Sequence, residues 1–175
     1  LTRLVESLLD FGRLQAGARP YRMERCDTRE LVGRVVEEFQ REVAPRGYQI
    51  AFDGEERASV EADEEALGRA IWNLLDNAVK YSPGNHRVEV SLARANGHVA
   101  ISVQDHGLGI PEKERAAIFG SFRRGEQASR LGIKGTGIGL AMVDHIVKAH
   151  QGRVEVESEP GHGSRFTIVL PGKEC

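Results

Sequence analysis

Three short segments, in a fixed order along 175 residues, constrain this chain more than any other feature. They are NLLDNAVKYS at 73–82, DHGLGI at 105–110 and GTGIGL at 135–140. The first carries asparagines at helical spacing, the second is an Asp-Gly turn after an apolar run, and the third opens a helix with glycines. A fold that uses all three together brings a helix face, a strand end and a helix start to one pocket.

Composition sets bounds on the fold and on partners. With 40% hydrophobic residues the chain can bury one sizeable core, so one globular domain is expected. The formal net charge is −2, from 24 basic and 26 acidic residues, and gives no global reason to bind nucleic acid or an anionic membrane. Cys26 and Cys175 share no CxxC or Cys/His spacing, which favours a reduced, intracellular protein without a cysteine metal site.

Targeting signals are not found in the sequence. No run approaches the roughly 18 apolar residues of a membrane span, and no signal sequence opens the chain. Because the chain begins at Leu1 rather than Met, we expect it to be a piece of a longer protein.

Residues 1–19 form a segment of their own. Apolar residues recur there at steps of three and four and form a stripe: Leu1, Leu4, Val5, Leu8, Leu9, Phe11 and Leu14. Gly17 and Pro20 follow as residues that commonly end a helix. Periodicity leaves two interpretations open: a helix folded on its own domain, or the end of a bundle helix between subunits.

Residues 20–175 are predicted to form the main domain. We expect helices at 28–44, with Thr28 as the capping residue, 64–80, 111–119 and 137–150. We expect strands at 48–52, 58–61, 87–95, 98–104, 152–158 and 164–170, with a hairpin at Asn96-Gly97. Residues 18–27 and 120–136 are predicted loops. The pattern indicates an α/β two-layer sandwich, with helices on one face of a mixed, mostly antiparallel sheet.

The long helix carries a polar face. Asn73, Asn77 and Lys80 lie at i, i+4 and i+7, and apolar residues occupy another face: Leu67, Ile71, Leu74, Leu75 and Ala78. An amide oxygen is a neutral, hard ligand suited to Mg²⁺, which completes its shell with phosphate and water oxygens. A lysine can meet phosphate directly. For an isolated NxxxN pattern, a solvated polar helix face would be the better interpretation. The presence of the segments at 105–110 and 135–140 favours a binding site instead.

Asp105 follows an apolar strand and precedes Gly107 and Gly109. A carboxylate there can accept a hydrogen bond from the exocyclic amine of adenine, while the glycines let the backbone approach the ring. Guanine presents an oxygen at that position, so adenine is predicted over guanine. The alternative is an ordinary Asp-Gly turn.

Gly135, Gly137 and Gly139 open the last predicted helix, where free N–H groups and the dipole favour anions such as phosphate. Tight helix packing or a dinucleotide turn would use similar spacing, but a dinucleotide turn directly follows a strand. The preceding loop carries basic side chains that could neutralise phosphate on closure, or could simply be solvated: Arg123, Arg124, Arg130 and Lys134.

Together these segments resemble the catalytic, ATP-binding domain of bacterial sensor histidine kinases, of the gyrase, Hsp90, histidine kinase and MutL superfamily. The family's five motifs occur in order: an asparagine box at 73–82, glycine boxes at 105–110, 135–140 and 161–164, and a phenylalanine box, IFGSF, at 118–122. The resemblance runs from Leu1 to about Pro171. It implies a Bergerat-type fold preceded by the remnant of a bundle helix.

The resemblance implies ATP and Mg²⁺ as cofactors. Asn77 would be the principal Mg²⁺ ligand with Asn73 assisting, and the implied catalytic residues are Asn73, Asn77, Lys80, Arg124 and Arg130. The residues implied to hold nucleotide are Asn73, Asn77, Lys80, Tyr81, Asp105, Gly107, Gly109, Ile110, Phe122, Gly135, Thr136, Gly137, Gly139 and Leu140. Phe119 and Phe122 would seat a lid that carries the two arginines. Lys134 departs from the family, which more often has glycine there.

Residues 1–17 resemble the end of the second helix of the family's dimerisation and phosphoacceptor domain, which favours the bundle interpretation. The acidic-Arg-Thr-Pro context of the family's phosphoacceptor histidine is not found. Six histidines lie instead in predicted turns, strands or the last helix: His86, His98, His106, His145, His150 and His162. We therefore expect the chain to bind ATP without autophosphorylating.

The same resemblance implies partners. The γ-phosphoryl would pass to a histidine of the dimerisation and phosphoacceptor domain, and then to an aspartate of a cognate response regulator. The parent would be a homodimeric inner-membrane sensor with this part in the cytoplasm. No contact of this chain with nucleic acid or membrane is expected.

Two rival functions differ in class. A dedicated ATP hydrolase of the gyrase or Hsp90 kind carries a glutamate where this chain has Asn73, and an amide cannot act as a general base. A non-catalytic module would bind nucleotide or a partner, a reading supported by the absent phosphoacceptor. A serine-directed anti-sigma kinase is a weaker variant, disfavoured by the bundle-helix remnant.

Overall fold

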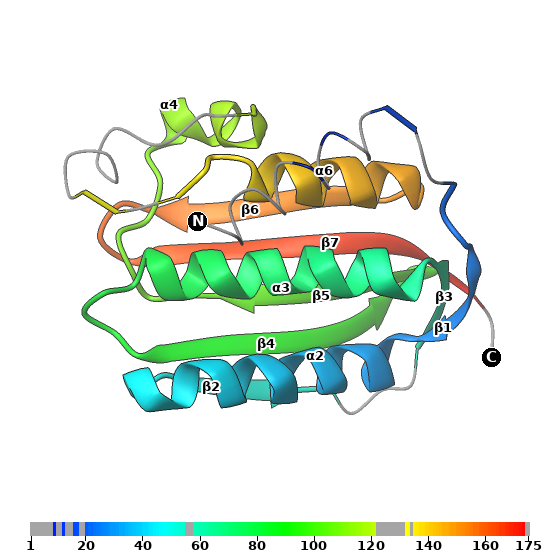
Figure 1. Ribbon diagram of the computed structural model, residues 1–175, viewed down its shortest axis with the longest axis horizontal. Coiled ribbons are helices and arrows are strands. Elements are labelled where there is room, and N and C mark those ends of the chain that lie inside the picture. Colours follow the sequence, from blue (N-terminus) through cyan, green and yellow to red (C-terminus); the bar gives the residue numbers. More distant parts are fainter. Residues whose placement is uncertain are drawn as a thin grey trace.

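A computed structural model describes residues 9, 12, 16–17, 20–54, 58–121, 132–133 and 135–173. These residues form a two-layer sandwich in which helices α2, α3 and α6 cover one face of a sheet (Figure 1). The predicted fold class is confirmed. Apolar side chains from both layers meet between them in one buried cluster.

The sheet is mixed and mostly antiparallel. Its strands are β1 (Glu24–Asp27), β2 (Gln49–Asp53), β3 (Ser59–Ala62), β4 (Arg87–Ala95), β5 (His98–Gln104), β6 (Arg153–Glu159) and β7 (Gly163–Lys173). The order is β1-β3-β7-β5-β4-β2, with β6 also paired to β7. Only β2 and β4 run parallel among the described pairs. Strands β3 and β6 share one edge of β7, because each pairs with a different part of it.

Two strand predictions were wrong for a tertiary reason. Residues 24–27 were predicted as loop but form β1, which pairs with β3 and buries only Cys26. Strand β7 continues past Leu170 to Lys173, because its last residues pair with Ser59 and Val60. Neither segment has an alternating apolar pattern of its own. Each is a strand because a partner strand supplies its hydrogen bonds.

The helices present apolar faces to the sheet. They are α2 (Thr28–Val43), α3 (Glu64–Lys80), α4 (Glu112–Arg115) and α6 (Gly139–Ala149), with 3₁₀ turns η1 (Ala44–Arg46) and η2 (Ala117–Phe119). The five apolar residues predicted for the inner face of α3 are all buried. Between α2 and α3, the Phe39 and Trp72 rings meet edge to face at 4.9 Å. The helix predicted at 111–119 is two short turns instead of one helix.

The start of α2 corrects another prediction. Asp27, not Thr28, caps this helix, since its carboxylate accepts from the backbone N–H groups of Arg29 and Glu30. Thr28 is fully buried, and its hydroxyl donates to the Ala58 carbonyl at 2.7 Å. The hydroxyl thus ties α2 to the segment that enters β3.

The first segment is described at only a few positions. Leu9 and Gly12 are helical, the Ala16 N–H donates to the Gly12 carbonyl at 3.0 Å, and Gly17 turns with φ +62°. The boundary between residues 1–19 and 20–175 stays a prediction. Among the residues that the structure describes, no helix has both the length and the apolar character to cross a membrane.

Candidate functional site

The polar face of α3 turns toward the start of α6. Asn73 is half-buried, and its amide nitrogen lies 3.4 Å from the Met142 sulfur, one turn into α6. A Cβ placed on Gly139 would lie 3.7 Å from Asn73 Oδ1 and 4.0 Å from Asn77 Oδ1. Two amide oxygens therefore flank the first residue of α6, as expected if the first and third segments share one pocket.

Lys80 has a partner that the sequence analysis missed. Its ammonium forms an ion pair with the Asp76 carboxylate, one turn earlier on α3. Both side chains stay open to solvent, at 36% and 38% exposure. The i, i+4 spacing of an acid before a base was the signal available in the sequence.

The second segment packs against the end of α3. The Leu108 N–H donates to the Tyr81 carbonyl at 3.0 Å, and Tyr81 is the C-terminal cap of α3. A Cβ on Gly107 would overlap that same carbonyl oxygen. Only glycine fits here without a shift, because the turn and the helix end approach through their backbones.

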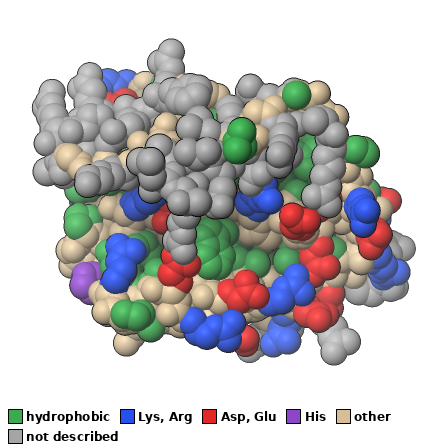
Figure 2. All heavy atoms as spheres, in the orientation of Figure 1, with side chains coloured by type: hydrophobic (Ala, Val, Ile, Leu, Met, Phe, Trp, Pro, Cys, Tyr) green, Lys and Arg blue, Asp and Glu red, His purple; other side chains and the backbone are tan. Residues whose placement is uncertain are grey.

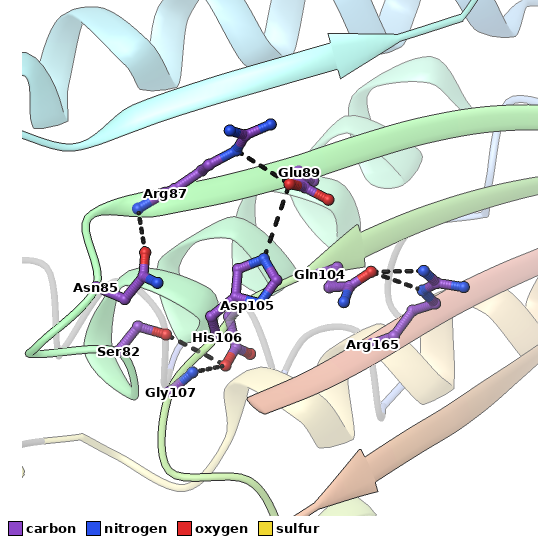
Figure 3. A network of polar contacts seen from close by, with 9 residues as sticks. All are labelled: Ser82, Asn85, Arg87, Glu89, Gln104, Asp105, His106, Gly107 and Arg165. Carbon is purple, nitrogen blue, oxygen red and sulfur yellow. Dashed lines mark hydrogen bonds and ion pairs between the residues drawn. The ribbon is translucent and has the colours of Figure 1, made fainter. Parts of the chain in front are cut away.

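Asp105 is a buried carboxyl group at this site. Its side chain is 5% exposed, and its Oδ1 accepts from the Gly107 N–H at 2.9 Å and from the Ser82 hydroxyl at 3.2 Å (Figure 3). Burial raises the pKa of Asp105 above its usual value, and the bonds from Gly107 and Ser82 oppose that rise. A buried carboxylate with one oxygen anchored is suited to accept a hydrogen bond through the other.

The last glycine box, residues 161–164, packs against the turn at residues 105–110. A Cβ on Gly109, which has φ +68°, would overlap the Glu159 carbonyl, and one on Gly163 would overlap the Asp105 carbonyl. The Gly161 N–H donates to the Leu108 carbonyl at 2.7 Å. Segments 105–110 and 161–164 are therefore held together mainly by backbone, which explains their glycines.

The start of α6 differs slightly from the prediction. The helix begins at Gly139 rather than Gly137, because Gly137 has φ +70° and cannot be helical. Thr136 Oγ1 accepts from the Ile138 N–H at 3.3 Å, while Gly135 is exposed. Three glycines thus stand at or before the N-terminus of a described helix.

Apolar residues line the same region. Ile110 and Leu140 are partly buried against the core, as is Phe119, whose ring lies edge to face with Phe166 at 6.4 Å. The predicted site residues Phe122, Arg124 and Arg130 lie outside the described residues, as do Arg123 and Lys134.

The residues around Asp105 continue the network onto the sheet. Gln104 accepts from Arg165 of β7, and His106 lies 3.8 Å from the Glu89 carboxylate of β4 (Figure 3). Figure 2 shows basic and acidic side chains interspersed along the lower part of the face that it presents. Neither sign of charge dominates that part of the face, in keeping with a net charge of −2.

Comparisons with known proteins identify the family of this chain. The family model for "Histidine kinase-, DNA gyrase B-, and HSP90-like ATPase" matches residues 62–174. The sensor-like histidine kinase SenX3 of Mycobacterium tuberculosis is 32% identical over 168 residues, which cover 96% of this chain and 41% of SenX3. The chain therefore spans about two fifths of that relative.

Solved structures give the same result. Full-length ShkA in complex with AMPPNP superposes with a TM-score of 0.84 at 30% identity, covering 99% of this chain and 36% of that one. The mycobacterial sensor histidine kinase MprB gives 0.74 at 34% identity, covering 88% of this chain and all of that one. The chain belongs to the histidine kinase-, DNA gyrase B- and HSP90-like ATPase family, and within it to the catalytic ATP-binding domains of bacterial sensor histidine kinases.

Proposed function

We propose that this chain positions ATP for transfer of the γ-phosphoryl to a histidine of a dimerisation and phosphoacceptor domain, in a longer sensor kinase. The observation that carries the proposal is the approach of Gly139 to the oxygens of both Asn73 and Asn77. The N-terminus of α6, where backbone N–H groups favour anions, thus lies beside two amide oxygens that could serve as neutral metal ligands. That pairing suits a nucleotide triphosphate with its metal.

Asp105 would recognise the base. Its Oδ1 is held by Ser82 and Gly107, so Oδ2 can accept from the exocyclic amine of adenine. Guanine would set a carbonyl oxygen against this carboxylate and leave both acceptors without a proton. The remaining walls would come from Tyr81, Ile110 and Leu140, and the backbone at Gly107 and Gly109 would approach the ring.

The two amides are of a chemical type that suits a Mg²⁺ ion. Their oxygens lie 3.7 and 4.0 Å from the position of a Cβ on Gly139, and Mg²⁺ usually takes few protein ligands and keeps water and phosphate oxygens. Asn77 would be the principal ligand, with Asn73 assisting. When bound, the ion would supply neutralisation of phosphate charge.

Phosphate charge would also meet protein groups. Lys80 would exchange Asp76 for a phosphate oxygen, and the start of α6 from Gly135 to Gly139, including Thr136 and Gly137, would offer backbone N–H groups. Arg124 and Arg130, with Phe122 seating the segment, would complete the charge balance. These residues align the γ-phosphoryl, and phosphoryl transfer needs alignment more than covalent help.

The partners follow from the same proposal. The acceptor histidine and the response-regulator aspartate would belong to other domains, and the parent would be a homodimeric membrane sensor with this domain in the cytoplasm. The chain by itself would bind ATP without phosphorylating itself. It would touch neither nucleic acid nor membrane.

Calorimetric titration of the purified chain tests this proposal. We expect a non-hydrolysable ATP analogue to bind with Mg²⁺, more weakly with EDTA, and the matching GTP analogue to bind at least about tenfold more weakly. Phosphorylation of a separately supplied phosphoacceptor domain would then test transfer. Equal binding of both analogues, or none, would overturn the proposal and favour a non-catalytic module.

A further inference from the structure

Ser82 is a buried polar residue to which neither the sequence motifs nor the proposed function assigns a role. It follows the C-terminal cap of α3 and is 0% exposed. Its hydroxyl donates to Asp105 Oδ1 at 3.2 Å, and Figure 3 shows the two side chains pointing toward each other. A fully buried hydroxyl aimed at a carboxylate has a larger effect than a surface contact, because both groups have lost water.

The backbone of Ser82 is fixed independently of Asp105. Its carbonyl accepts from the buried Tyr48 hydroxyl at 3.2 Å, and the same hydroxyl lies 3.1 Å from the Val79 carbonyl. The Asn85 N–H also donates to the Ser82 carbonyl at 3.3 Å. The serine hydroxyl is thus presented from a rigid turn.

Two hydrogen-bond donors reach the same oxygen of Asp105. Ser82 and the Gly107 N–H donate to Oδ1, and the backbone of Ser164 also lowers the pKa of this carboxyl group. Of the two donors, Ser82 is the side chain and can be changed without altering the backbone. The Ser82 and Gly107 bonds therefore anchor the carboxylate through Oδ1.

We infer that Ser82 is a specificity-positioning residue, whose hydroxyl holds the Asp105 carboxylate so that Oδ2 selects adenine over guanine. The inference rests on the proposed function, since it needs Asp105 to face the base. It identifies a residue that acts through Asp105 without touching the nucleotide.

The chemistry explains why selectivity, not only affinity, depends on this bond. An ionised carboxylate can only accept, whereas a neutral carboxyl also carries an O–H that could donate to the guanine oxygen. Burial favours the neutral form of Asp105, while Ser82 and Gly107 favour the ionised form. His106 has the same effect when it is protonated, and its Nε2 lies 3.8 Å from the Glu89 carboxylate. Loss of Ser82 therefore removes a share of the discrimination.

Three variants of the chain test the inference by titration with the ATP and GTP analogues. Ser82→Ala removes the donor, Ser82→Thr keeps it, and Ser102→Ala removes a hydroxyl that bonds Thr167 at 2.8 Å on the sheet. We expect Ser82→Ala to lower the ATP-to-GTP affinity ratio about tenfold, as for one hydrogen bond to a charged group. Ser82→Thr should restore the ratio, and Ser102→Ala should leave it unchanged.

A double variant shows whether Ser82 acts through Asp105. In an Asp105→Asn background, Ser82→Ala should cause no further loss of the ratio, because the two changes remove one interaction. An unchanged ratio in Ser82→Ala, or a full additional loss in the double variant, would overturn the inference. If the parent chain itself fails to prefer ATP, the proposed function fails instead. Equal weakening of both analogues in Ser82→Ala would show a merely structural serine and also contradict the inference.

Discussion

The proposed nucleotide site has two ends that are built differently: a proposed base end around Asp105 and a proposed phosphate end around Lys80. At the base end, Asp105 and Ser82 are buried and bonded to each other, and the turn carrying Asp105 joins its neighbours through backbone. At the phosphate end, Lys80 and Asp76 are more than one third exposed and hold each other on one helix. The base end is therefore assembled before a ligand arrives, whereas the phosphate end keeps groups that can exchange partners.

The difference separates selectivity from affinity. Preorganised, buried groups reject a wrong ligand strongly, because a mismatch leaves polar atoms unpaired. Exposed ion pairs contribute little by themselves, so a strongly charged ligand can displace them. Changes at the base end should alter which nucleotide binds, and changes at the phosphate end should alter how tightly it binds.

The largest expected effect is at the backbone contact of the base end. Gly107→Ala should lower the free energy of unfolding by about 3 kcal/mol, since its Cβ would overlap the Tyr81 carbonyl. Nucleotide affinity should fall with it. Chemical denaturation measures the change, and Gly84→Ala is the control, because a Cβ there meets nothing within 4 Å. Equal stability of both variants would show that the turn is not rigid.

Asn77→Ala tests the metal role at the phosphate end. It should weaken Mg²⁺-dependent binding of the ATP analogue at least about 100-fold. Mutation of residues that only hydrogen-bond a metal ligand already lowers metal affinity about 10–100-fold, and loss of a ligand itself should cost more. Titrations with Mg²⁺ and with EDTA separate this loss from general damage. Asn96→Gly, in the hairpin where Asn96 has φ +51°, is the control. A parent-like Mg²⁺ dependence in Asn77→Ala would refute the metal assignment.

Asp105→Asn should lower discrimination against the GTP analogue about tenfold, since an amide can also donate to guanine. If discrimination stays at the parent value, Asp105 does not read adenine.

The same variant has a pH signature in the free protein. Because burial raises the folded pKa of Asp105, its carboxyl contributes stability below the unfolded pKa, near 3.9, that is lost as pH rises through the folded pKa. The difference in free energy of unfolding between Asp105→Asn and the parent should therefore shift in favour of the variant from pH 4 to pH 7. Denaturant melts at both pH values measure this; a pH-independent difference would contradict the buried charge.

The smallest effect is expected for the exposed pair. Asp76→Asn should change both stability and ATP-analogue affinity by no more than about twofold in equilibrium constant, as exposed i, i+4 pairs do. Asp144→Asn is a matched control, because Asp144 pairs with Lys148 at the same spacing on α6, at 2.7 Å. A fivefold gain in ATP-analogue affinity confined to Asp76→Asn would contradict this expectation. It would show that the Asp76 carboxylate competes strongly with phosphate for Lys80.

The sequence correctly predicted those elements whose own residues carry a clear periodic or turn pattern. The predicted limits 64–80 of α3 and the β4–β5 hairpin are confirmed. The helix has a full apolar face, and Asn96-Gly97 forms a turn with positive φ at both residues. By contrast, the capping residue of α2 was misassigned, because both Asp27 and Thr28 can cap and only the contact with Ala58 decides between them.

The site divides in the same way. Spacing alone placed Asn73, Asn77 and Lys80 on one helix face, and the net charge of −2 gave no global reason to expect a nucleic acid or membrane partner. Tertiary structure decided that Gly139 lies beside those amides, that Lys80 is held by Asp76, and that Ser82 anchors Asp105. It also decided that residues 24–27 are a strand. Periodicity records which way a side chain faces within one element, whereas contacts between distant segments arise only when the elements pack.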